Sequence, residues 1–175
     1  MFRTLPRVRS FRQNVLLAVF LSTTAGLVNS IGLLLLGILT TNVTGHFAFL
    51  AESLAIPTKY GALDYLLFIL FFFVGALLSG WLTVRKEHSQ QTRNPNTGIV
   101  IEMVILTVVG LAGDAWNNSP SHRTELTAIL LLAMGLQNGL VTVISKATIR
   151  TTHLTGLLTD LGIDLAQWFG NKRIF

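Results

Sequence analysis

Two polar corners hold the residues of this chain whose types and spacing suit the binding of a small molecule. The first corner, residues 41–46, reads T-N-V-T-G-H and follows a long apolar stretch. The second, residues 152–156, reads T-H-L-T-G. The pattern T-x-x-T-G therefore occurs twice, and each copy opens a segment that is too short or too polar to be an ordinary membrane span.

Each corner has the residues needed to end one helix and start another. Gly45 and Gly156 are expected to let the chain turn, and Thr44 and Thr155 to cap the next helix with their hydroxyl groups. The unpaired N–H groups at such a helix start attract an anion or a polar ligand. The alternative interpretation is a capped turn that binds no ligand. Because the pattern occurs twice, we favour the ligand site over this alternative.

The apolar segments before the corners carry a second repeated pattern. The letters G-L-x-N occur at residues 26–29 and again at residues 135–138. A Gly and an Asn three residues later share one face of a helix. One interpretation is that the Gly lets two helices approach and the amide bonds across them. The other, compatible with it, is that Asn29, Gln137 and Asn138 line a polar cavity between two copies.

Other polar side chains give less specific indications. Glu102 lies one turn into an apolar segment. It is expected to be either a proton site or a carboxylate that reaches basic residues at the interface. His46 either titrates near neutral pH or serves as a hydrogen-bonding partner. Asp160 and Asp164, one turn apart, favour an amphipathic helix at the membrane surface over a metal site. With four His at unsuitable spacings and no Cys, neither a metal nor a cofactor is predicted.

The composition is that of an integral membrane protein. Hydrophobic residues make up 51% of the chain and charged residues 12%, whereas a soluble domain has about 25% charged residues. The net charge of +5 would suggest nucleic acid in a soluble chain. Here the basic residues lie between apolar segments and report topology, so no nucleic-acid partner is expected. Sequence motifs of soluble enzymes are missing, and no enzymatic activity is predicted.

Four segments are long and apolar enough to cross a hydrocarbon core of about 30 Å, which takes about 20 residues. They cover residues 15–39, 64–84, 98–113 and 126–144. Residues 46–56 form a shorter apolar segment, and residues 154–169 form one that carries two Asp. Residues 114–125 are expected to form a polar turn.

The basic residues decide whether the two shorter segments cross. If neither crosses and the N-terminus is cytoplasmic, all 13 Lys and Arg except Lys59 and Arg123 lie on the cytoplasmic side. If residues 46–56 crossed, the basic loop after the second span would move outside. We therefore expect an all-α polytopic membrane protein with a cytoplasmic N-terminus, four spans and two re-entrant or interfacial segments.

With this topology the chain forms two inverted repeats within a single transmembrane domain, residues 1–175. The first copy covers about residues 14–84, a linking span about 98–113, and the second copy about 124–170. The second copy ends before a span that would match residues 64–84. Inverted repeats with short segments in matching positions are typical of secondary transporters.

The chain resembles the YoaK family of bacterial inner-membrane proteins, which has no assigned function. The resemblance covers most of residues 16–168 and rests on the first T-G corner, on M-G-L-Q-N at residues 134–138 and on T-T-H-L-T-G at residues 151–156. Family members usually have Asp where this chain has Asn29 and T-G-N where it has T-G-H, and they continue into a further span. The resemblance implies a protein of the bacterial inner membrane, with transport as one function open to the family and no established substrate. If the family's Asp carries protons or cations, Asn29 could not do so.

The sequence therefore predicts a transporter of a small polar or anionic solute that works by alternating access, with the lipid bilayer and the solute as its partners. The residues expected at the solute site are Asn29, Thr41, Asn42, Thr44, Gly45, His46, Gln137, Asn138, Thr152, Thr155 and Gly156.

Two other functions stay open at this point. One is a non-transporting scaffold or assembly partner, in which the small pairs Ser22/Gly26 and Gly75/Ser79 join helices; a homo-oligomer is among its forms. The other is a membrane-embedded enzyme with Glu102 and His46 as acid and base. The expected positions of those two residues near opposite faces of the membrane argue against the enzyme.

Overall fold

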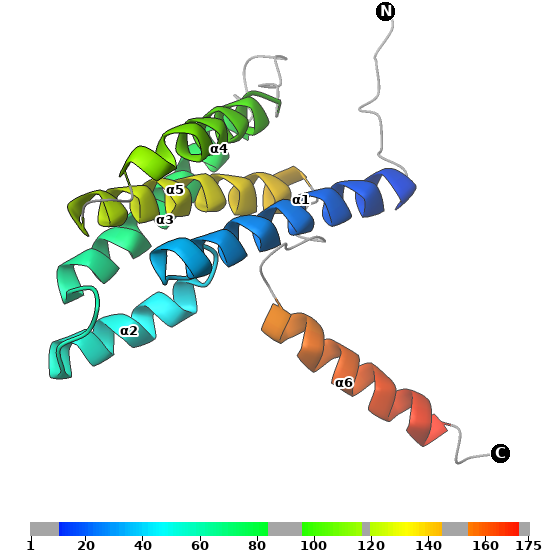
Figure 1. Cartoon of the computed structure of the whole chain (residues 1–175). Helices are drawn as coiled ribbons and strands as arrows, with labels where there is room; N and C mark the ends of the chain where they lie inside the picture. The colour runs from blue at the N-terminus through cyan, green and yellow to red at the C-terminus, as the bar shows by residue number, and fades with distance from the viewer. Residues whose placement is uncertain (1–10, 84–95, 117–119, 145–153, 172–175) are drawn as a thin grey trace, which may run out of the picture.

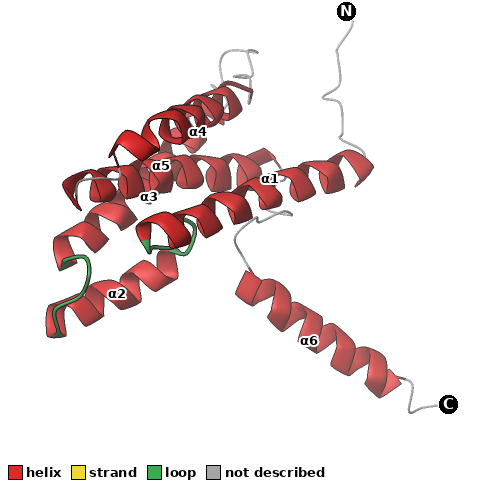
Figure 2. Cartoon of the chain, in the orientation of Figure 1, coloured by secondary structure: helices red, strands yellow, loops and turns green. Residues whose placement is uncertain are grey.

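The protein is all-helical over the residues that its computed structural model describes, which are 11–83, 96–116, 120–144 and 154–171. Within these ranges six α-helices and one π-helical turn follow one another without a strand (Figures 1 and 2). The elements are α1 (Phe11–Ile31), η1 (Gly32–Leu36), α2 (Val43–Ala55), α3 (Ala62–Thr83), α4 (Asn96–Trp116), α5 (Pro120–Ile144) and α6 (Leu154–Asn171). The predicted all-α class is confirmed.

Three of the described helices are long and apolar enough to cross a membrane, through the segments Ala18–Leu36, Ala62–Thr83 and His122–Val143. They correspond to three of the four predicted spans. The fourth lies in α4, a helix of 21 residues whose apolar part, Thr97–Leu111, is shorter. This set of helices is that of a polytopic helical membrane protein.

Helix α5 lies at the centre of the bundle, packed against α1, α3 and α4 (Figure 1). Its side chains Leu131, Met134, Leu136 and Val141 are buried. The surrounding helices instead expose large apolar side chains, as Phe20 does on α1. In water such a surface would be costly, whereas lipid favours it.

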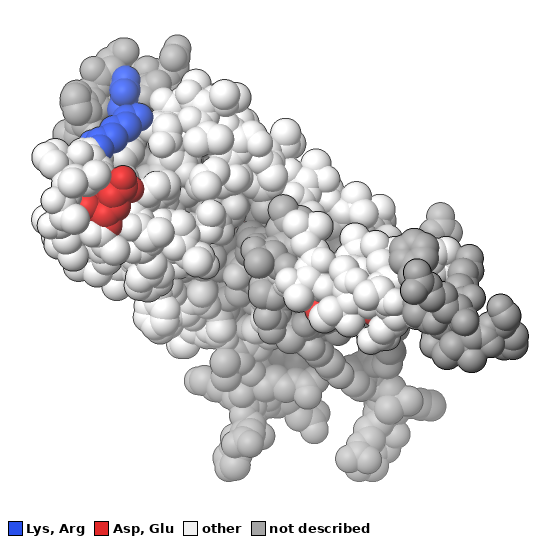
Figure 3. Space-filling view, turned by 90° about the horizontal axis from the view of Figure 1, so that it is seen from below, with Lys and Arg blue, Asp and Glu red and all other residues white. Residues whose placement is uncertain are grey.

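The charged side chains are distributed as a membrane requires. Figure 3 shows basic side chains beside acidic ones at one end of the visible face. Between this end and α6, the described part of the visible surface carries no charge. On this face, an uncharged surface next to a charged end fits a helix bundle that crosses the hydrocarbon core.

Helices α3 and α5 pack with their backbones in contact at small residues. A Cβ atom added at Gly75 would collide with the carbonyl oxygen of Leu132, and one added at Gly135 with the carbonyl oxygen of Phe72. Along the same interface, Ser79 lies against Gly139. Small residues at such spacings let membrane helices approach closely. The expectation that Gly75 and Ser79 pair two helices is thus confirmed.

The matching position in α1 is open. Gly26, which corresponds to Gly135 in the repeated G-L-x-N pattern, has no atom within 4 Å of the place that a Cβ would occupy. Ser22, one turn before it, is exposed. The two copies of the pattern therefore have different surroundings within the described residues, and the expected pairing through Ser22 and Gly26 is not present there.

The first and second spans run in opposite directions. Leu21 contacts Gln137 and Ala25 packs beside Ala133, so α1 is antiparallel to α5. Phe72 of α3 lies against Gly135 of α5, and Ser79, farther along α3, lies against Gly139, farther along α5. These two helices are therefore parallel. Since α1 and α3 are antiparallel, α2 between them completes no crossing of its own (Figure 1). This agrees with a re-entrant or interfacial segment.

Two of the expected boundaries are wrong. The first span does not reach residue 39, because the helix stops at Leu36 and Gly37 takes the left-handed conformation. The expected polar turn at residues 114–125 is largely helix, since α4 continues to Trp116 and α5 begins at Pro120. Proline suits the first turn of a helix, where its missing N–H costs nothing.

Helix α6 stands apart from the other described helices (Figure 1). It covers the predicted segment, and its side chains Asp160, Asp164, Leu161, Leu165 and Trp168 are all exposed. Its amphipathic, interfacial role stays a prediction.

We expect Gly135→Ala to destabilise the fold and Gly26→Ala, the matching change in α1, to leave it intact. The added methyl at Gly135 forces α3 and α5 apart, and overpacking costs about 1–3 kcal/mol. At Gly26 there is space, and Ala favours a helix over Gly by about 1 kcal/mol. Thermal unfolding in detergent measures both variants. Equal melting temperatures would contradict the close backbone contact.

Candidate functional site

The polar corner between α1 and α2 begins with a break in the first span. Helix α1 widens into the π-turn η1, and Gly37 follows with φ +73°. The N–H of Gly37 donates to the carbonyls of Gly32 and Leu33. A non-glycine residue would be strained at this φ, and its Cβ would collide with the amine of Lys59. The turn glycine of this corner is therefore Gly37.

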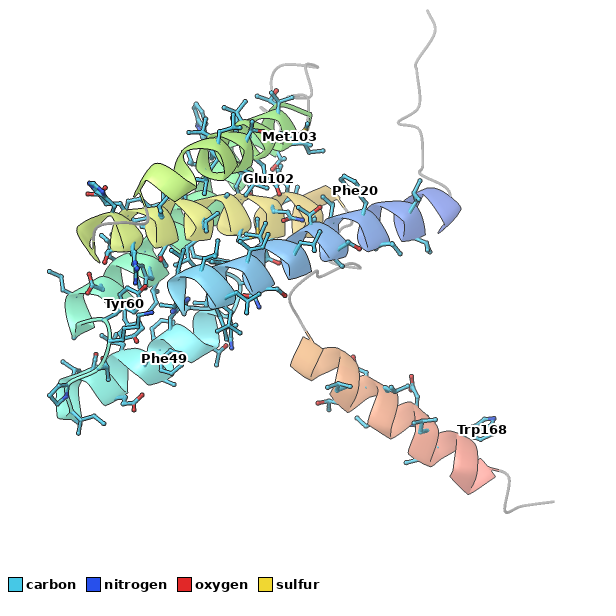
Figure 4. All side chains as sticks on the ribbon, viewed as in Figure 1. Phe20, Phe49, Tyr60, Glu102, Met103 and Trp168 are labelled. Carbon is cyan, nitrogen blue, oxygen red and sulfur yellow. The ribbon has the colours of Figure 1, made fainter. Side chains whose placement is uncertain are left out.

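The last carbonyl group of the span, that of Leu36, finds donors farther along the chain. The Leu36 carbonyl accepts hydrogen bonds from Lys59 Nζ at 2.7 Å and from the Tyr60 hydroxyl at 2.8 Å. The positive charge of Lys59 also suits the negative end of the helix dipole. Figure 4 labels Tyr60 between α2 and α3, from which it reaches this carbonyl. These bonds tie the break to the segment before α3.

Asn29 holds the loop from the side of α1. Its Oδ1 accepts the backbone N–H of Thr41 at 3.1 Å. The side chain is half-buried, so this N–H would otherwise lose its partner in surroundings poor in water. Asn29 and Thr41, both predicted at the solute site, are thus joined to each other in the frame of the corner.

Helix α2 starts earlier than the sequence pattern indicated, and a different residue caps it. Asn42 Oδ1 accepts the N–H of Gly45 at 3.0 Å, and the helix begins at Val43. The predictions that Thr44 caps this helix and that Gly45 turns the chain are therefore wrong. Asn is among the best N-cap residues, and once Asn42 caps the helix, Thr44 and Gly45 fall inside its first turn.

His46 is the most enclosed polar residue of the corner. Its side chain is 1% exposed, and Nε2 lies 2.7 Å from the Leu39 carbonyl oxygen. The ring packs against Phe68 at 5.8 Å and Tyr65 at 6.3 Å, between ring centroids. Burial lowers the pKa of His46, and the bond to Leu39 opposes this in part. A carbonyl only accepts, so in the neutral ring Nε2 carries the proton and Nδ1 is a free acceptor.

Two buried polar atoms of the corner have no hydrogen-bond partner within the described part of the chain. One is His46 Nδ1, and the other is the hydroxyl oxygen of Thr40, whose side chain is 0% exposed. A third such atom, Gln137 Oε1, lies elsewhere, on α5. Buried polar atoms are almost always paired in folded proteins, so each exception calls for an explanation.

The structure does not bring the two predicted halves of the site together. Gln137 Nε2 donates to the Leu21 carbonyl at 2.7 Å, eight residues before Asn29. At 1.5 Å per residue, Asn29 and Gln137 are thus separated by about 12 Å along the helix axes, and Asn138 lies one residue farther from Asn29. Thr155 and Gly156 lie in the first turn of α6, which stands apart, and Thr152 is outside the described residues.

Glu102 is not part of the corner. It is buried on α4 against α5, whereas His46 packs on the first turns of α3. The acid and base of a membrane-embedded enzyme are therefore not close to each other. Sequence reasoning missed Thr40, Gly37 and Lys59. A Gly that directly follows an apolar run is the C-terminal signal that would have indicated Gly37.

Comparisons with known proteins agree with the resemblance inferred from the motifs. The sequence profile described as "Protein of unknown function (DUF1275)" matches residues 17–175. The chain is also similar to the UPF0700 transmembrane protein YoaK of Bacillus subtilis (strain 168), with 26% identity over 155 residues, 88% of this chain and 68% of that protein. No solved structure matches the chain significantly.

We expect Asn29→Leu to destabilise the corner and Asn29→Asp to preserve it. Leucine leaves the Thr41 N–H unpaired, which costs about 1–3 kcal/mol. An Asp oxygen still accepts that N–H, so the residue usual in the resembling family is compatible with this geometry. Thermal unfolding at pH 7 compares the two variants. If Asn29→Leu is as stable as the parent protein, the bond to Thr41 does not hold the loop.

Acid should destabilise the protein through His46. The native state disfavours the imidazolium, whereas an unfolded His takes a proton near pH 6.5, so stability is lost as the pH falls through 6.5. We expect the drop in melting temperature between pH 7 and pH 5 to be smaller in His46→Gln. His122→Gln, a change at an exposed His, serves as the control. An identical drop in parent and His46→Gln would contradict the burial of a neutral ring.

Proposed function

The chain belongs to the DUF1275 family of proteins of unknown function, and we propose that it is a membrane transporter of a small polar solute. One observation carries the proposal. At the break after α1, the Thr40 hydroxyl and His46 Nδ1 are buried without a hydrogen-bond partner among the described residues. A polar solute or the water that accompanies it would complete these bonds.

The position of the two atoms supports a solute site. Lipid cannot satisfy polar groups, so irregular backbone in a membrane protein is tolerated where protein or an aqueous cavity surrounds it. Here the Thr41 and Gly45 N–H groups and the Leu36 carbonyl are bonded within the protein, through Asn29, Asn42, Lys59 and Tyr60. The break is fixed by these hydrogen bonds and still leaves two polar atoms without a hydrogen-bond partner among the described residues. It thus resembles the broken helices that bind substrates in secondary transporters.

The chemistry of His46 narrows the solute class. A neutral ring with its proton on Nε2 presents a lone pair at Nδ1, which attracts a donor and repels an anion. Thr40 can donate or accept. We therefore favour a solute with a hydroxyl or amino donor over a simple anion.

The mechanism we propose is alternating access between two inverted repeats. The antiparallel course of α1 and α5, which carry the two G-L-x-N patterns, supports it (Figure 1). In this proposal Asn138, Thr155 and Gly156 belong to the second repeat, Asn138 through its G-L-x-N pattern and the other two through its corner. Placement in the bacterial inner membrane with a cytoplasmic N-terminus rests on the distribution of basic residues along the sequence.

A second candidate is a non-transporting assembly partner. The observation in its favour is the open face of α1 around Gly26, whose counterpart on α5 is filled by α3. A chain of this kind would form a stable complex through α1 and would move no solute.

Uptake by proteoliposomes tests the transporter. Labelled glycerol, glycine and inorganic phosphate represent neutral, zwitterionic and anionic solutes. We expect faster entry of glycerol or glycine than in protein-free vesicles, and a loss of at least tenfold in Thr40→Val. Because valine removes an unpaired hydroxyl at nearly equal volume, the variant should melt no lower than the parent protein.

Thr44→Val is the matched control: the sequence predicted Thr44 at the solute site, but its side chain is exposed on the first turn of α2 and is not part of the site proposed here. It should transport like the parent protein. If no probe enters faster than in empty vesicles, or if Thr40→Val transports normally, the corner is structural and the assembly partner is favoured.

A further inference from the structure

The second polar spot of the bundle lies between α1, α4 and α5. Glu102 is 4% exposed although it lies six residues after the start of α4, about 9 Å along the axis at 1.5 Å per residue. Figure 4 labels it on the side of α4 that faces α5. A carboxyl group buried among membrane helices must have either a partner or a proton.

The neighbours of Glu102 on α4 show which turn of α5 it faces. One turn before it, the Cβ position of Gly98 is 2.6 Å from Leu140 Cδ1. One turn after it, Leu106 packs against the cluster that contains Ala133. The two helices are thus antiparallel, and Glu102 faces the turn of α5 between Ala133 and Leu140.

Gln137 occupies that turn. Its side chain is 1% exposed, and its Nε2 already donates to the Leu21 carbonyl of α1. Its Oε1 has no hydrogen-bond partner among the described residues. This oxygen can only accept, so what the site lacks is a donor.

No basic side chain of the described residues is available at this level. The segments 15–31, 66–83, 97–111 and 126–143 surround the site, and Glu102 is their only ionisable residue. An ionised carboxylate would be buried without a counter-charge among the described residues and against the turn of α5 that carries the unpaired oxygen of Gln137, which is unfavourable. A protonated carboxyl supplies the missing donor.

We propose that Glu102 and Gln137 form a proton-binding site inside the bundle, in which the carboxyl O–H of Glu102 donates to Gln137 Oε1. Binding adds one proton to the carboxylate, and release returns it to water without any other reactant. A metal cation fits less well, because the described surroundings offer few oxygen atoms besides these two side chains. The site is distinct from the α1–α2 corner, so it does not depend on the proposed transport.

Infrared spectroscopy of the full chain in lipid nanodiscs tests the site. At pH 7 we expect the C=O stretching band of a protonated carboxyl group, and its loss in Glu102→Gln. Glu52→Gln, a change at an exposed carboxylate of α2, should keep the band. Gln137→Leu should shift the band, because the carboxyl group loses its acceptor. Glu102→Gln should melt like the parent protein, since a neutral amide of equal size replaces a neutral acid.

Three results would overturn the proposal. The first is an infrared spectrum at pH 7 in which parent protein and Glu102→Gln do not differ, because Glu102 is then ionised and paired. The second is an unshifted band in Gln137→Leu. The third is loss of the band when sodium replaces choline in the buffer, because a metal cation then takes the place of the proton.

Discussion

The structure depends on the need to satisfy backbone polar groups where a helix ends within an apolar bundle. The first span stops at Leu36, the last residue of η1, and the Leu36 carbonyl has no further helical turn to bond with. Lys59 and Tyr60 supply the donors from 23 and 24 residues farther along the chain. That requirement brings the segment before α3 back against the end of α1.

The same requirement separates structural polar residues from functional candidates. Asn29, Asn42 and Nε2 of His46 are bonded to the backbone of the corner, so their first role is to hold it. The Thr40 hydroxyl and His46 Nδ1 are left over after this frame is complete. A polar atom that the fold does not use, in a place that lipid cannot satisfy, is the physical basis of the solute site proposed here.

The sequence predicted the helical class, the spans and the short segment after the first span. The bilayer thickness sets the length of an apolar span, and basic loops favour the cytoplasmic side. It also indicated Gly75 and Ser79 as a packing surface. It did not distinguish which residue of T-N-V-T caps α2, because Thr and Asn both suit that position. The bond between Gln137 and Leu21 joins residues 116 apart and leaves no local pattern. The separation of Asn29 from Asn138 likewise depends on how α1 and α5 are offset along their axes.

The most direct test of the account concerns the ring of His46. Nitrogen NMR of ¹⁵N-histidine-labelled protein in lipid at pH 7, assigned with His46→Gln, reports which ring nitrogen carries the proton. We predict a neutral ring protonated at Nε2, with an Nδ1 resonance that moves when glycerol or glycine is added. A ring protonated at Nδ1, or an Nδ1 resonance that none of the probe solutes changes, would contradict it.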